Sequence, residues 1–189
     1  GKSFDTTMGF TPLTGVTMAT RSGDVDVELV TYMMKKLNIT DPEEMISILT
    51  RHSGLLGISG VSSDMRDVIA AKDAGNKRAQ IAVTLFVKNI VRYIGQYYAE
   101  MKGLDGIVFT AGIGENSDVI RKLVCDELEF MGVNLDDTLN SKGEEGFITK
   151  PDSKIAALLV PTDEELMISR DIEVIKLQEQ KEISSKKPL

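Results

Sequence analysis

A short apolar segment that runs into a glycine-containing turn is the feature that most constrains the fold of this chain. Residues 106–110, Gly-Ile-Val-Phe-Thr, have the β-branched and aromatic content of a short buried strand. Residues 111–117, Ala-Gly-Ile-Gly-Glu-Asn-Ser, follow directly, and Asn116 or Ser117 can cap a helix that begins at Asp118. The two glycines are therefore predicted to lie in a strand-to-helix turn.

Such a turn is suited to a phosphate-containing ligand. Gly112 and Gly114 permit backbone torsions and close approaches that a Cβ atom hinders, and the helix start behind them offers free N–H groups. A nucleotide is the expected ligand. The pattern is neither the dinucleotide-binding Gly-x-Gly-x-x-Gly nor the P-loop, so by itself it leaves a nucleotide site and an ordinary structural turn equally open.

Periodicity and capping residues divide the rest of the chain into alternating strands and helices. Asp26 and Asp41 are predicted N-caps, Pro42 favours a first helical position, and Asn76 starts the longest apolar repeat. Thr162 is the predicted N-cap of the last helix. The predicted helices cover residues 27–37, 42–52, 65–72, 76–103, 118–131 and 162–177; strands cover 147–148 and 155–160; loops cover 53–60, where a short strand is the alternative, and 136–146. This alternation predicts an α/β class with a mixed or parallel sheet flanked by helices.

Composition excludes several classes of function. With 189 residues, 42% of them hydrophobic, the chain can bury one core. Its net charge of −7, without a basic cluster interleaved with aromatics, argues against nucleic-acid binding. Apolar runs fall short of the about 20 residues of a membrane helix, and no signal-peptide pattern is present, so we expect no membrane association and a cytoplasmic location. Cys125 is the only cysteine, which excludes an internal disulfide and predicts a small buried residue.

Five further segments, together with the glycine turn at residues 111–117, form a set of motifs in a fixed order. They are residues 8–13 (Met-Gly-Phe-Thr-Pro-Leu), 20–24 (Thr-Arg-Ser-Gly-Asp), 53–60 (Ser-Gly-Leu-Leu-Gly-Ile-Ser-Gly), 62–67 (Ser-Ser-Asp-Met-Arg-Asp) and 161–168 (Pro-Thr-Asp-Glu-Glu-Leu-Met-Ile). In this order and spacing, the chain resembles the C-terminal domain of acetate kinases, the acetokinase family, from Gly1 to about Ile175. The resemblance implies one lobe of the actin-like, ribonuclease-H-like ATPase fold.

The resemblance also implies a domain organisation. Residues 1–177 would form the C-terminal nucleotide-binding lobe, and residues 178–189, rich in Lys, Glu and Ser, would form a flexible tail. Because the sequence starts in what reads as mid-domain, we expect a fragment whose N-terminal half is absent. In the family that half supplies further catalytic residues, so the fragment is expected to be inactive alone.

Roles for individual residues follow from the same resemblance. Arg21 matches the family arginine that stabilises the transferred phosphoryl group and helps to hold the acceptor carboxylate, and Pro12 matches a residue of the pocket for the acetate methyl group. Glu164 matches the glutamate associated with Mg²⁺. The family commonly has Gly where this chain has Ala19. The residues matched to the nucleotide site are Asp64, Met65, Arg66, Gly112, Ile113, Gly114, Glu115 and Asn116.

The implied activity is reversible phosphoryl transfer from ATP to acetate, which gives acetyl phosphate and ADP. The implied partners are these substrates, Mg²⁺ and a second subunit in a homodimer formed through this lobe. Two alternatives stay open from the sequence. One is a relative that acts on propionate or butyrate, because a methylene changes binding by only about 1–3 kcal/mol. The other is a non-catalytic nucleotide-binding and dimerisation module.

Overall fold

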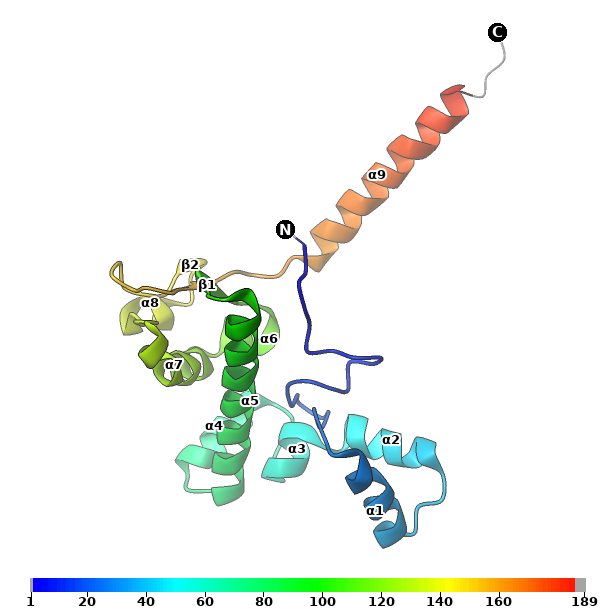
Figure 1. Ribbon diagram of the computed structural model, residues 1–189, viewed down its shortest axis with the longest axis vertical. Coiled ribbons are helices and arrows are strands. Elements are labelled where there is room, and N and C mark those ends of the chain that lie inside the picture. Colours follow the sequence, from blue (N-terminus) through cyan, green and yellow to red (C-terminus); the bar gives the residue numbers. More distant parts are fainter. Residues whose placement is uncertain (1, 186–189) are drawn as a thin grey trace.

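The computed structural model of this protein describes residues 2–185 as helices packed below a small sheet, followed by a projecting helix (Figure 1). The strands are β1 (Gly106–Phe109), β2 (Gly146–Phe147) and β3 (Ala156–Leu159). The helices are α1 (Val27–Leu37), α2 (Pro42–Arg51), α3 (Gly54–Ser59), α4 (Met65–Asp73), α5 (Lys77–Met101), α6 (Ala111–Asn116), α7 (Asp118–Glu127), the 3₁₀ turn η1 (Glu129–Met131), α8 (Asp137–Lys142) and α9 (Glu164–Ser185).

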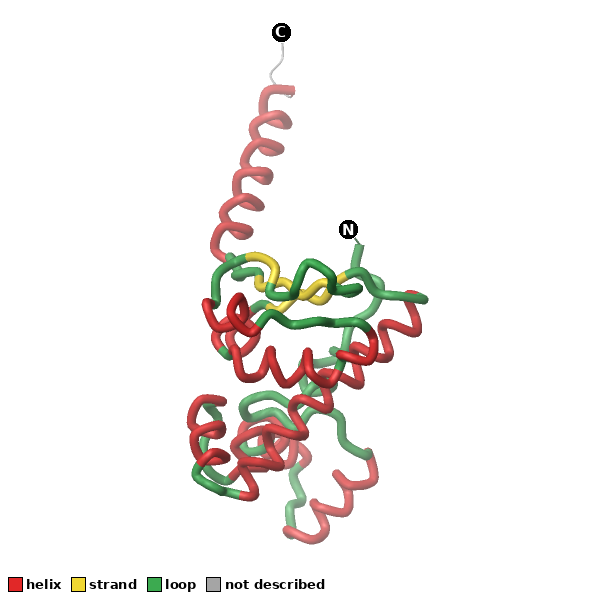
Figure 2. Tube along the Cα trace, turned by 90° about the vertical axis from the view of Figure 1, so that its left-hand side faces the viewer, coloured by secondary structure: helices red, strands yellow, loops and turns green. Residues whose placement is uncertain are grey.

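The sheet is mixed, with β3 in the centre between β1 and β2. β1 pairs with β3 in parallel, with Phe109 opposite Leu159, and β2 pairs with β3 in antiparallel orientation. Helices lie beneath one face of the sheet (Figure 2). The opposite face exposes Val108 and Phe147. The predicted α/β class with a mixed sheet and flanking helices is therefore confirmed.

The core forms where α5 packs against α3, α4 and α7, below the sheet. The buried residues of α5 are Ala79, Ala82, Val83, Phe86 and Val87, whose three- and four-residue spacing places them on one helix face. Cys125 on α7 is 1% exposed, as predicted, and burial raises the pKa of its thiol to about 12. A thiol in that state is not a nucleophile at neutral pH.

Capping side chains begin α1, α2, α5 and α7 where the sequence predicts. Asp26, Asp41 and Asn76 each accept a hydrogen bond from a backbone N–H in the first turn of α1, α2 and α5. Ser117 does the same for α7, accepting from the Ile120 N–H at 3.2 Å. The predicted helix over residues 118–131 is divided in the structure into α7 and η1.

Three segments predicted as loops or turns are short helices. Residues 53–60 contain α3, residues 136–146 contain α8, and the glycine turn contains α6. Leu55 of α3 is fully buried, and Asn140 of α8 is 3% exposed. Burial of these side chains stabilises α3 and α8, helices of six residues that would not be stable alone. α6 also has six residues but buries none of them.

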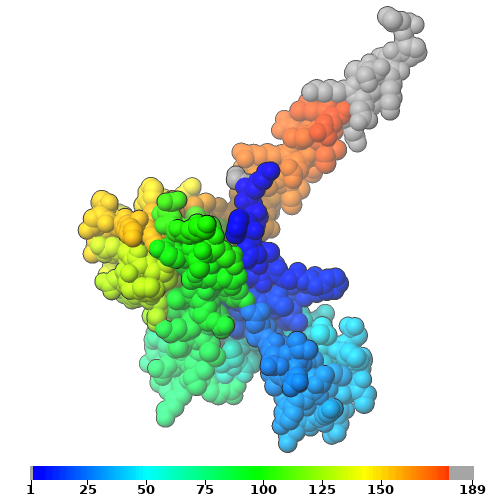
Figure 3. All heavy atoms as spheres, in the orientation of Figure 1, coloured from blue at the N-terminus to red at the C-terminus, as the bar shows by residue number. Residues whose placement is uncertain are grey.

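Helix α9 leaves the body after β3 and projects away from it (Figures 1 and 3). Its N-cap is Asp163, whose carboxylate accepts from the Leu166 N–H at 2.9 Å, so the predicted cap at Thr162 is wrong by one residue. Apolar side chains such as Ile168 and Ile172 are exposed along it. Residues 178–185 continue α9, and residues 186–189 lie outside the described residues, so the predicted mobility of 178–189 stays a prediction.

Candidate nucleotide site

A hollow of about 620 Å³ lies where the start of α4 faces α6. The residues that line it are Ala19, Ser63, Asp64, Met65, Arg66, Gly112, Ile113, Asn116 and Ser117. The structure thus brings together two segments that the sequence assigns to the nucleotide but separates by the whole of α5. Gly114 and Glu115 belong to the same turn but do not line the hollow.

The glycines of α6 are not needed for unusual backbone torsions, contrary to the prediction. The residue with a left-handed conformation is Ala111, with φ of 58°. A Cβ atom at Gly112 would meet nothing within 4 Å, whereas one at Gly114 would lie 3.4 Å from the Phe109 carbonyl carbon. A Cβ atom at position 114 would therefore be in ordinary contact with β1, and Gly112 leaves its side of the hollow open.

Arg121 of α7 hydrogen-bonds to the main chain of α6 with a buried guanidinium group. The side chain is 1% exposed, and Nη1 donates to the carbonyls of Gly114 at 2.9 Å and Glu115 at 2.8 Å. Nε and Nη2 donate to the side chain and the carbonyl of Asn140, both at 2.7 Å. Burial lowers the pKa of Arg121. Arg121 thus satisfies two of the carbonyls at the end of α6, those of Gly114 and Glu115, which a helix leaves without partners.

Asp64 and Arg66 form a paired edge of the hollow. Asp64 caps α4 by accepting from the Arg66 N–H at 2.8 Å, and Arg66 Nη2 donates to the same carboxylate at 2.5 Å. These hydrogen bonds from Arg66 lower the pKa of Asp64 to about 2 and raise the pKa of Arg66. The pair orients an exposed guanidinium plane, which can stack on an aromatic base, at the mouth of the hollow.

The loop that carries Arg21 is fixed by main-chain hydrogen bonds to α3. The N–H groups of Ser53, Leu55 and Leu56 donate to the carbonyls of residues 20, 18 and 19 at 2.9–3.0 Å. Gly54 makes this approach possible, because its φ is +62° and a Cβ atom there would lie 2.3 Å from the Met18 carbonyl oxygen. The segment 53–60 therefore positions the Arg21 loop, and none of its residues lines the hollow.

Arg21 carries its guanidinium group without a carboxylate partner in the described part of the chain. The side chain is half-buried, and its one hydrogen-bond contact within the described residues is with Met18 Sδ at 3.8 Å. Asp24, on the same loop, accepts from the Tyr93 hydroxyl of α5, and this bond raises the pKa of Tyr93 to about 12. The loop is therefore anchored while the Arg21 donors remain free for an anion.

Pro12 and Glu164, the remaining predicted site residues, lie outside the hollow. Pro12 is exposed in the segment before α1, and Glu164 is exposed in the first turn of α9. Among residues 2–185, no group of three or more His, Cys, Asp or Glu side chains gathers to hold a metal ion. A lone carboxylate fits an ion that is carried mainly by phosphate oxygens and waters, which is the usual coordination of Mg²⁺.

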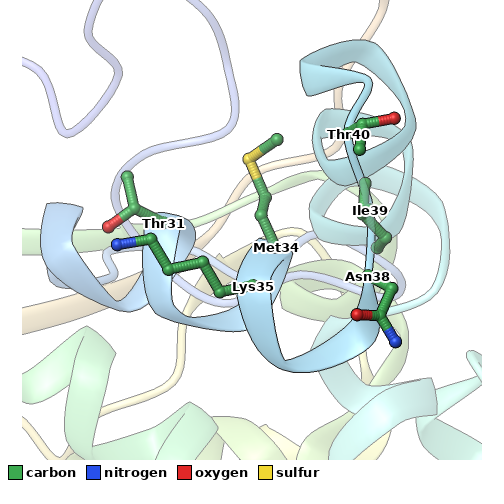
Figure 4. Close-up of a pocket in the computed structure, with 6 residues that line it drawn as sticks. All are labelled: Thr31, Met34, Lys35, Asn38, Ile39 and Thr40. Atoms are coloured by element: carbon green, nitrogen blue, oxygen red, sulfur yellow. The ribbon is translucent and has the colours of Figure 1, made fainter.

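A second hollow, of about 460 Å³, lies beside α1 (Figure 4). It is lined by Thr31, Met34, Lys35, Asn38, Ile39 and Thr40, whose side chains point in different directions. None of these is a predicted site residue, and only Lys35 is charged.

As for membranes, none of the helices in the described region is both long and apolar enough to span one.

Comparison with known proteins decides the family. The sequence model of the acetokinase family matches residues 1–170. The chain belongs to the acetokinase family. Among curated acetokinase sequences, the acetate kinase of Fructilactobacillus sanfranciscensis is 58% identical over 176 residues, which cover 93% of this chain and 44% of that protein. The chain thus spans less than half the length of the curated relatives it matches.

Solved structures of acetokinases share the fold. The acetate kinase of Porphyromonas gingivalis has a TM-score of 0.84 and 43% identity, over 89% of this chain and 43% of that one. A propionate kinase from Francisella tularensis subsp. tularensis SCHU S4 has a TM-score of 0.82 and 38% identity, over 88% of this chain and 42% of that one. Both the family and the fold expected from the sequence motifs are confirmed.

Sequence reasoning missed Arg121, which bonds the carbonyls of α6, and Asn140, which accepts from the Arg121 guanidinium group. A signal for Arg121 was present, because Val124, Cys125 and Leu128 follow it at the spacing of one buried helix face. An arginine on such a face needs buried acceptors. No comparable signal marked Asn140, whose burial depends on how α8 packs against α7.

Proposed function

We propose that the full-length protein transfers a phosphoryl group reversibly between ATP and acetate, giving acetyl phosphate and ADP. This chain supplies the nucleotide-binding lobe. The observation that carries the proposal is the hollow between α4 and α6, lined also by Ala19 of the loop that carries Arg21. The family membership and the separate agreement of the 20–24 and 161–168 motifs support the same reaction.

In this proposal the hollow receives the adenosine part of the nucleotide. Arg66 stacks on the base, and the open side of Gly112 lets the ring or sugar approach the main chain. The remaining residues assigned to this site are Asp64, Met65, Ile113, Gly114, Glu115 and Asn116. Gly114 and Glu115 belong to the same turn but do not line the hollow, so they support the residues that do. Pro12 lines the pocket for the acetate methyl group.

Arg21 acts on the reacting groups. An acetate oxygen attacks the terminal phosphorus of ATP, a new P–O bond forms, and the bond to the bridging oxygen of ADP breaks. The planar fork of Arg21 donors stabilises the charge on the transferred phosphoryl oxygens and orients the carboxylate. Glu164 would hold a Mg²⁺ ion, which when bound neutralises charge on the phosphates.

A propionate-specific reaction is the second candidate. It is supported by the propionate kinase among the structural relatives, which is 38% identical to this chain. One methylene changes binding by only about 1–3 kcal/mol. We therefore expect either enzyme to act on both acids, at different rates. Relative turnover on acetate, propionate and butyrate distinguishes the candidates.

The proposal includes a homodimer and a cytoplasmic location. A second subunit is supported by the large apolar side chains that this lobe exposes, such as Tyr32, Phe130 and Ile168. The acidic composition and the absence of a long apolar helix in the described residues are compatible with a cytoplasmic enzyme. Sedimentation of the full-length protein tests the dimer directly.

The 189-residue chain alone is expected to bind ADP weakly and to make no acetyl phosphate. The hollow is present, but the chain spans only 44% of the length of the Fructilactobacillus sanfranciscensis relative. Calorimetry with millimolar ADP and an acetyl phosphate assay measure the two properties. Failure to bind ADP argues against the nucleotide assignment of the hollow. Phosphoryl transfer by this chain argues against its need for further residues, and binding without transfer by the full-length protein favours the non-catalytic module.

Replacing Glu164 with Ala in the full-length protein is expected to raise the Mg²⁺ concentration needed for activity, with little change in stability. Glu164 is exposed, and a carboxylate in the first turn of a helix contributes only about 0.3–1 kcal/mol. Glu165→Ala is the matched control, because it removes the neighbouring exposed carboxylate of the same turn. Identical Mg²⁺ titrations for the two variants contradict the metal assignment.

A further inference from the structure

The carboxyl ends of β1 and β3 bring the two functional segments together. Because the strands are parallel and Phe109 pairs with Leu159, α6 and the residues that lead to α9 leave the sheet at the same edge. The Val160 N–H donates to the Phe109 carbonyl at 3.0 Å and continues this pairing. One segment lines the adenosine hollow, and the other ends at Glu164, the carboxylate assigned to Mg²⁺.

Glu115 joins these two segments through one carboxylate oxygen. Its Oε1 accepts from the Thr162 N–H at 2.9 Å, from the Thr162 hydroxyl, and from the Ala111 N–H at 2.6 Å. The hydrogen bonds from Thr162 lower the pKa of Glu115, so the carboxylate is charged at neutral pH. A charged acceptor makes these bonds stronger than those between neutral groups.

The orientation of α6 separates Glu115 from the ligand side. Gly112, Ile113 and Asn116 line the hollow, whereas Glu115 does not. Its main chain is fixed as well, because Arg121 Nη1 donates to the Glu115 carbonyl at 2.8 Å. Arg121 of α7 therefore holds the main chain of Glu115, while the Glu115 carboxylate reaches Thr162 in the segment before α9.

We propose that Glu115 is a positioning residue that fixes the nucleotide-binding turn relative to the segment that carries Glu164. This assignment rests on the proposed function. It differs from a direct nucleotide contact, because the effect of Glu115 on the metal-dependent step passes through Thr162. We call the hydrogen bonds from Thr162 to Glu115 the Glu115 tie. Loss of this tie lets the Glu164 carboxylate, which would hold Mg²⁺, shift relative to the bound nucleotide, and leaves the adenosine hollow itself intact.

A double-mutant cycle in the full-length protein tests the tie. The variants are Glu115→Ala, Thr162→Val and the two combined, with Glu43→Ala as the control because it makes the same change at an exposed position on α2, outside both segments. The measurements are the Mg²⁺ concentration that half-activates the kinase, and the affinity for ADP by calorimetry in EDTA. Glu115→Ala is expected to raise the half-activating Mg²⁺ concentration roughly tenfold, the loss typical of a hydrogen bond to a charged group. Thr162→Val is expected to raise it less, because valine keeps the backbone N–H that donates to Glu115 and loses only the hydroxyl bond.

The combined variant is expected to resemble Glu115→Ala, which already removes both bonds to Thr162, with ADP affinity in EDTA changed less than about twofold throughout. Additive effects, or a loss of ADP affinity confined to variants of Glu115, would overturn the positioning role in favour of direct contact. If Glu115→Ala does not fold, Glu115→Gln and Thr162→Val keep the shape of both side chains and complete the cycle. Wild-type protein that binds no ADP contradicts the proposed function instead, because the Glu115 tie then has no nucleotide site to position.

Discussion

Replacing Arg21 with Lys in the full-length protein is expected to lower turnover by roughly 10³-fold or more, because a point charge cannot reproduce the planar fork of donors. The Arg21 guanidinium has no carboxylate partner in the described residues, so the loss is not a broken ion pair. The loop backbone is held by hydrogen bonds that do not involve this side chain. Steady-state rates of acetyl phosphate formation measure the change.

The control for Arg21 is Arg51→Lys, which makes the same chemical change at an exposed position near the end of α2. We expect turnover near that of the wild type for this variant. Unchanged melting temperatures for both variants would show that the fold is retained. Near-normal turnover of Arg21→Lys would remove Arg21 from the catalytic role.

Replacing Arg121 with Met is expected to lower the free energy of unfolding by about 3–5 kcal/mol, because carbonyl groups of α6 and Asn140 lose their buried donors. Methionine retains much of the volume of the side chain but donates no hydrogen bond. The stability of α6 depends on the same contacts, so ADP binding should weaken together with the fold. Urea-induced unfolding and ADP calorimetry measure the two effects.

Arg78 provides the matched control for Arg121. It donates to the carbonyls of Ile58 at 2.9 Å and Gly57 at 2.7 Å, but it is exposed. Water can replace its hydrogen bonds, so we expect Arg78→Met to cost about 1 kcal/mol or less. Equal losses for the two variants would contradict the claim that burial makes Arg121 structurally important.

Local chemistry predicted the long elements well. Asp26, Asp41 and Asn76 begin their helices as expected, and the apolar repeat of α5 faces the core. The β-branched run before Phe109 forms β1. These predictions succeed because caps and helical periodicity act over a few residues and need no knowledge of distant contacts. The motifs likewise predicted the family, whereas the role of each site residue remains a prediction.

The short helices could not be read in the same way. α3, α6 and α8 have six residues each, too few for a helical period to stand out or for a helix to form alone. α6 was expected to be a turn shaped by its glycines, yet Ala111 takes the left-handed conformation. Its shape depends on Arg121 of α7, which donates to a carbonyl of α6, and on Glu115 of α6, which accepts from Thr162. Both contacts join α6 to residues distant in sequence or on another element.

The sequence alone therefore determined which segments form the long helices and strands, and which residue types are available for phosphoryl transfer. Only the tertiary structure decided that residues 64–66 meet α6 across one hollow, and that Glu115 turns away from this hollow toward Thr162. The physical reason is the range of the interactions. Caps and periodicity are local, whereas the hollow and the Glu115 tie depend on parallel pairing of β1 with β3 and on packing against α5 and α7.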